Sequence, residues 1–127
     1  MEISEKQIAA VTALPGPERY KHFVKVVADR EEVWGLKQDG WALAATDRGD
    51  AVMPLWPARQ YAELCATDDW SGYAATAIAL DEFMNEFMQR LDSEGILPAI
   101  FATPQNKGVT PSTAELRADL ERELTNY

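Results

Sequence analysis

The feature that most constrains the fold is an Asp-Gly pair, Asp39-Gly40, set between two runs rich in aromatic and branched residues. Such a pair readily adopts the positive φ values of a type I′ turn, so it predicts a β-hairpin of strands 33–37 and 41–46. Side chains alternate along a strand, and a one-residue slip would move them to the other face. In this register four large apolar side chains share one face: Trp34, Leu36, Trp41 and Leu43.

A second turn, Asp47-Arg48-Gly49-Asp50, leads to a third apolar run at residues 51–56. With tight pairing, Val52 and Trp56 join the same face, so we expect a meander of three antiparallel strands. Residues 73–79 and 96–101 have the length and composition of one or two further strands.

Helix signals flank these strands. Ser4 with Gln7 and Ser112 with Glu115 have the spacing of a capping box, which marks the start of the first and last helices. A second helix can begin at Pro17 and a short one at Pro57, while the strongest helical spacing covers residues 80–91 and stops at Gly95. Together these elements predict one α+β domain over residues 1–127, with helices packed on an antiparallel sheet in two layers.

The composition fits a folded domain and excludes several functions. The chain has 127 residues, of which 46% are hydrophobic, and its 21 acidic and 12 basic residues give a net charge of −9. Such a charge opposes nucleic-acid binding. A single cysteine, Cys65, and a single histidine, His22, exclude an internal disulfide and a zinc site built from several such ligands. We expect no cofactor, no metal and no membrane contact. The first residues lack a secretion-signal pattern, so we expect a cytoplasmic location.

Three groups of residues have types that occur in chemical sites. Cys65 with His22 could form a nucleophilic dyad, but no local motif marks either residue, so a buried thiol and a solvated histidine are the simpler interpretation. Neighbouring carboxylates occur at 29–32 and 68–69, where solvated surface charge is the simpler interpretation. The loop at 106–108 could hold an anion before the last helix, or be an ordinary turn. We therefore expect no catalytic residue.

The tryptophans divide into two groups. Three of them, Trp34, Trp41 and Trp56, share a strand face and are expected to pack in the core against the helix at 80–91. Trp70 instead lies in a polar segment with Asp68 and Asp69. A tryptophan in such a loop can anchor a protein partner, or fold back over the edge of the core.

Several stretches, in this order and spacing, resemble the bacterial domain-of-unknown-function family 2750 over nearly the whole chain. They are residues 32–36 (EVWGL), 39–43 (DGWAL), 54–57 (PLWP), 61–65 (YAELC), 80–83 (LDEF) and the loop at 103–108. The resemblance implies a small bacterial intracellular protein that consists of this domain, and it supplies no activity and no site residue. A more distant similarity in topology and acidity links the chain to immunity proteins and to the type III secretion enhancer family.

We therefore expect a non-enzymatic binding or regulatory module that acts through a protein partner. One version is an immunity-like protein that covers a basic surface. The candidate binding residues are Trp70, Asp68, Asp69, Tyr73, Trp56 and Tyr61. An alternative is a small-ligand binder or an enzyme with a pocket between the sheet and the helix at 80–91, near Trp56 and Tyr61. Self-association through the last helix or the sheet edges is a third possibility.

Overall fold

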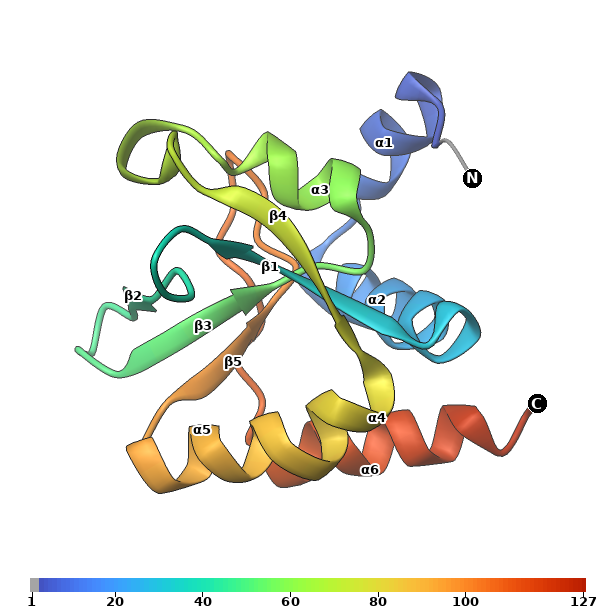
Figure 1. Cartoon of the computed structure of the whole chain (residues 1–127). Helices are drawn as coiled ribbons and strands as arrows, with labels where there is room; N and C mark the ends of the chain where they lie inside the picture. The colour runs from blue at the N-terminus through green and yellow to red at the C-terminus, as the bar shows by residue number, and fades with distance from the viewer. Residues whose placement is uncertain (1–2) are drawn as a thin grey trace.

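The structure, a computed structural model, describes residues 3–127, which form an α+β fold with about 47% helix and 21% strand (Figure 1). In chain order the elements are α1 (Glu5–Thr12), α2 (Gly16–Arg30), β1 (Glu32–Lys37), β2 (Ala44–Ala45), β3 (Ala51–Leu55), α3 (Arg59–Leu64), the 3₁₀ turn η1 (Asp68–Trp70), β4 (Ala74–Ala79), α4 (Leu80–Glu82), the π-helical turn η2 (Phe83–Phe87), α5 (Met88–Glu94), β5 (Leu97–Ile100) and α6 (Thr113–Leu124). The α+β class is confirmed. Within the described residues, no helix combines the length and apolar content needed to span a membrane.

The helix signals are confirmed because they are local. The Ser4 side chain accepts a hydrogen bond from the Gln7 amide at 3.1 Å, and Ser112 with Glu115 forms a complete capping box. Gly95 ends α5 with a φ of 69°, a left-handed conformation that a residue with a side chain rarely adopts.

The three-strand antiparallel meander is wrong. β1 pairs antiparallel along its whole length with β4, with Val33 opposite Ile78. β3 pairs antiparallel with the two-residue β2 and parallel with β5. The expected antiparallel pairing of the second strand with the third is therefore present as β2 with β3, but only isolated bridges link β1 to this pair, at Trp34–Trp56 and Lys37–Trp41.

The expected type I′ turn is wrong, because neither Asp39 nor Gly40 has a positive φ and the turn is one residue longer than expected. Lys37 lies opposite Trp41, so Gln38 joins Asp39 and Gly40 in the loop. The shifted register turns Leu43 outward, and its side chain is 48% exposed. β1 gains a longer partner in β4, which buries Val33 against Ile78.

The core lies where the strands cross, and helices lie on both sides of it, so the two-layer arrangement is also wrong. Figure 1 shows α1 and α3 on one side of the strands and α5 and α6 on the other. α3 packs against β1 and β4, and α2 packs against α6. Trp56 is fully buried, as expected, whereas Trp34 and Trp41 are partly buried. Trp41 contacts Phe87 edge-on, with ring centroids 5.6 Å apart.

Candidate functional site

The candidate site is a groove of about 680 Å³ on the sheet formed by β2, β3 and β5. Its sheet side is lined by small side chains, namely Ala44, Ala45, Val52, Pro54 and Ala99. Because these side chains are short and apolar, they leave a hollow where larger residues would fill the space. The opposite boundaries come from a turn at 46–48, from Trp70 and from the loop at 102–108, which we call the rim loop.

Trp70 is the last residue of η1, the turn that precedes β4, and its side chain lines the groove. Its amide donates to the Thr67 carbonyl at 2.9 Å, and its own carbonyl accepts from the Tyr73 amide at 2.9 Å. The side chain is partly buried and lines the groove. Trp70 therefore packs against the edge of the core and also borders the groove.

The rim loop is held from beneath by a buried arginine. Arg19, only 3% exposed, donates through Nε to the Phe101 carbonyl at 3.0 Å. Its two terminal nitrogens donate to the carbonyls of Leu14 (2.6 Å) and Lys107 (3.2 Å). No carboxylate of residues 3–127 pairs with it, so three backbone dipoles hold the charge. One side chain thus ties the start and the end of the rim loop to α2.

The backbone at both ends of the rim loop is unusual. Phe101 is fully buried and has a φ of 62°, a conformation that costs a large residue about 1–3 kcal/mol. Its amide donates to the Leu55 carbonyl at 2.9 Å, and its ring lies 4.8 Å from that of Tyr61. At the other end, a Cβ on Gly108 would lie 2.8 Å from the Ile100 carbonyl oxygen. Close packing therefore fixes the loop's path.

An ion pair links the rim loop to the turn at 46–48. Lys107 Nζ contacts Asp47 Oδ1, and both side chains are largely exposed. Hydrogen bonding and charge attraction from Lys107 lower the pKa of Asp47. An anion at 106–108 would have to displace this carboxylate. A surface pair of this kind contributes little to stability, so a bound partner can separate it at low cost.

The structure separates the six expected binding residues into two groups. Trp70 lines the groove, Asp68 and Asp69 are exposed on the same turn, and Tyr73 follows, partly buried. Two others are core residues, namely Trp56 and Tyr61. The Trp56 indole donates to the Ala102 carbonyl at 2.9 Å and so supports the rim loop from inside. The Tyr61 hydroxyl is buried without a hydrogen-bond partner among the described residues.

The proposed Cys65–His22 dyad does not form. The Cys65 thiol donates to the Ala102 carbonyl at 3.5 Å, and burial raises its pKa to about 11, so it stays protonated near neutrality. Burial, followed by the nearby charges of Arg30 and Lys25, lowers the pKa of His22. Within residues 3–127 no group of three or more His, Cys, Asp or Glu side chains is placed to hold a metal ion.

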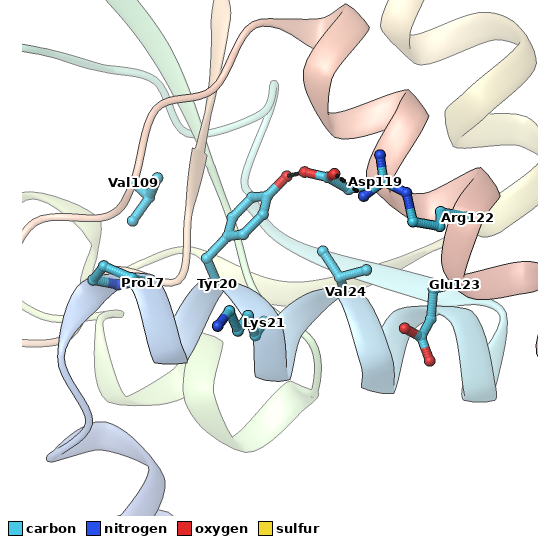
Figure 2. A pocket seen from close by; sticks show the side chains of 8 residues that line it. All are labelled: Pro17, Tyr20, Lys21, Val24, Val109, Asp119, Arg122 and Glu123. Carbon is cyan, nitrogen blue, oxygen red and sulfur yellow. Dashed lines mark hydrogen bonds and ion pairs between the residues drawn. The ribbon is translucent and has the colours of Figure 1, made fainter.

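A second hollow, of about 460 Å³, lies between α2 and α6 (Figure 2). There the Tyr20 hydroxyl donates to Asp119 Oδ2 at 2.5 Å, and Arg122 contacts the other carboxylate oxygen at 3.1 Å. Burial and the hydrogen bond to Asp119 raise the pKa of Tyr20, which keeps the phenol neutral. Figure 2 shows these polar groups pointing toward one another. The arrangement joins the two helices through side-chain contacts.

Sequence reasoning missed the small residues under the groove and the role of Arg19. The alanines carry no signal alone, because their importance comes from strands that meet only in the fold. Arg19, in contrast, does have a signal in the sequence. It precedes Phe23 and Val27 at four-residue intervals, which places a charge on the buried stripe of α2.

A family model described as "Protein of unknown function (DUF2750)" matches residues 20–120 of the 127. The matched segment includes the residues that line the groove. No curated protein and no solved structure matches the chain.

Proposed function

We propose that this chain, which belongs to the DUF2750 family, is a non-enzymatic binding or regulatory module that holds a segment of a protein partner in the groove beside Trp70. The observation that carries the proposal is the groove itself, with its apolar sheet side and tryptophan border. Tryptophan is among the residues that contribute most binding energy in protein interfaces. A bacterial, cytoplasmic setting is part of the proposal, supported by the single free cysteine.

The way the rim loop is held supports this function. A loop already fixed by Arg19 and Gly108 loses little conformational entropy when a partner binds, so more of the contact energy contributes to affinity. The chain's charge of −9, with Asp68 and Asp69 exposed beside Trp70, favours a partner whose contacting surface is basic. An immunity-like protein that covers a basic surface is one such module.

The volume of the groove favours one alternative, a small apolar ligand, although no residue of the helix at 80–91, where the pocket was expected, lines the groove. About 680 Å³ lies within the range of about 300–1,000 Å³ typical of small-molecule sites. Trp56 and Tyr61 would not contact that ligand directly, because both are fully buried. An enzyme is less well supported, since the single thiol stays protonated near neutrality and is already bonded to a carbonyl.

Selection from a random peptide library displayed on phage tests the proposal. Ala44 is exposed and lines the groove, so Ala44→Trp should fill it without disturbing the core. Leu43→Trp is the matched control, because Leu43 is the adjacent residue, is also exposed, and lies outside the groove.

We expect peptides that bind the wild type and Leu43→Trp but bind neither Ala44→Trp nor Trp70→Ala. Peptides that bind all four proteins equally would show that the groove is not the site. If no peptide binds, but a small molecule copurifies with the wild type and is absent from Ala44→Trp, the ligand alternative replaces the proposal.

A further inference from the structure

β4 belongs to the two-stranded sheet with β1, and not to the sheet that lines the groove. Within residues 3–127, β4 is an edge strand of six residues that pairs with β1 alone. It contains four alanines, Thr76 and Ile78, and no charged residue or proline. Proteins usually protect such edges with lysine, proline, a bulge or a covering element, because an open edge pairs readily with another strand.

Hydrogen-bond geometry identifies which groups of β4 are free. Trp34 exchanges both backbone hydrogen bonds with Trp56, at 2.9 and 2.8 Å, so Trp34 points its backbone toward β3. Along an antiparallel strand, successive residues direct their backbone amides and carbonyls to opposite sides, so those of Val33 and Gly35 point toward β4. The Leu80 amide, which donates to the Glu31 carbonyl at 2.9 Å, continues the same register.

It follows that the backbone amides and carbonyls of Ala75 and Ala77 point away from β1. The amide of Ala79 also points away from β1. No turn, cap or side-chain hydrogen bond among residues 3–127 involves these groups. Their side chains offer little obstruction, because Ala77 and Ala79 are exposed and Ala75 is partly exposed. A strand can therefore approach to the usual spacing of about 4.8 Å.

The charges around β4 indicate what kind of strand fits. Asp68 and Asp69 precede it, and Asp81 and Glu82 follow it, all with exposed side chains. Lys37, opposite Ala74, is the nearby cation on β1, and its ammonium lies over the Trp41 ring at 5.1 Å.

A second copy laid antiparallel on this edge would bring acidic ends together, which disfavours self-pairing. An extended segment with basic ends would place its positive charges beside both acidic pairs.

We propose that the β4 edge is a strand-addition site for an extended, basic segment of a partner protein. The partner would continue the sheet beyond β4 through the free groups of Ala75, Ala77 and Ala79. The β4 edge and the groove share the flanking Asp68 and Asp69, but the edge binds through the backbone of β4 and the groove through its lining side chains, so either proposal can fail while the other stands.

Amide hydrogen exchange followed by NMR tests the proposal. The probes are a synthetic peptide that alternates valine and threonine between lysine-rich ends, and the same peptide with glutamate ends. Ala77→Pro should prevent pairing, because it removes an outward amide and leaves the bonds to β1 intact. Ala77→Val is the matched control, since it keeps that amide.

We expect the lysine peptide to slow exchange at Ala75, Ala77 and Ala79 by about tenfold or more in the wild type, in Ala77→Val and in the groove variant Ala44→Trp. Neither the glutamate peptide nor the Ala77→Pro protein should show this effect. Equal protection by both peptides would overturn the assignment of a basic partner. If neither peptide slows exchange at these amides, the site is overturned. The same holds if the protein is a dimer in which these amides are already fully protected without peptide.

Discussion

Replacing Arg19 with lysine tests how the rim loop is held. The guanidinium donates to three backbone carbonyls, of Leu14, Phe101 and Lys107, at 2.6 to 3.2 Å. A lysine ammonium keeps the charge but lacks the planar fork that reaches three separated acceptors. Arg19→Lys should therefore retain about one of these hydrogen bonds and lose two.

The magnitude follows from the charge of the donor and its burial. A hydrogen bond to a charged group contributes about 1.5–3 kcal/mol, so losing two should lower the free energy of unfolding by about 3 kcal/mol or more. That is a large fraction of the 5–15 kcal/mol typical of a domain. No carboxylate of the described residues pairs with Arg19, so the loss should be the same at pH 5 and pH 8.

Urea unfolding followed by tryptophan fluorescence gives the measurement, with the exposed Arg48→Lys as the control. The control should change the free energy of unfolding by less than about 0.5 kcal/mol. A loss below about 1 kcal/mol for Arg19→Lys would refute the three-carbonyl arrangement. So would a loss that shrinks as the pH falls through the carboxylate range, because it would reveal an acidic partner.

Three further predictions follow from groups around the site. Tyr61→Phe should raise the free energy of unfolding by about 1 kcal/mol, because the hydroxyl is buried without a partner; a decrease in urea unfolding experiments would show that the hydroxyl is bonded. Gly108→Ala should cost about 1–3 kcal/mol, because its Cβ would meet the Ile100 carbonyl, whereas Gly40→Ala, which meets nothing, should be nearly neutral in thermal melts. Cys65 should react slowly with iodoacetamide at pH 7 and faster as the pH rises toward its pKa of about 11; rapid labelling at pH 7 would contradict its burial.

The sequence predicted the elements whose causes are local. Ser112 and Glu115 lie within one turn of each other, so their capping pattern determines where α6 begins whatever surrounds it. Gly95 and the apolar spacing of residues 80–91 act over the same short range. These features need no knowledge of the rest of the fold.

The strand pairing could not be read in the same way. The Asp39-Gly40 turn closes a three-residue loop, and the long partner of β1 is β4, which lies far along the chain from that turn. The parallel pairing of β3 with β5 leaves no short-range pattern at all. Hydrophobic side chains in β1 and β3 are equally compatible with several partners, so the tertiary fold decides among them.

The candidate site was predicted only in part, for the same reason. Trp70, Asp68 and Asp69 stood out because a tryptophan among acids in a turn-rich segment is unusual. Trp56 and Tyr61 are also large aromatics, but the fold buries both beneath the rim loop. The alanines and valine under the groove matter only through the strands that assemble there.

The measurement that tests the central claim most directly is affinity capture from an extract of the organism that encodes the chain. Wild type, Ala44→Trp and Leu43→Trp serve as tagged baits in parallel, and bound proteins are identified by mass spectrometry and tested again in purified form. We expect a protein that binds the wild type and Leu43→Trp and is lost with Ala44→Trp. The same proteins on all three baits, or none on any, would contradict a partner-binding groove beside Trp70.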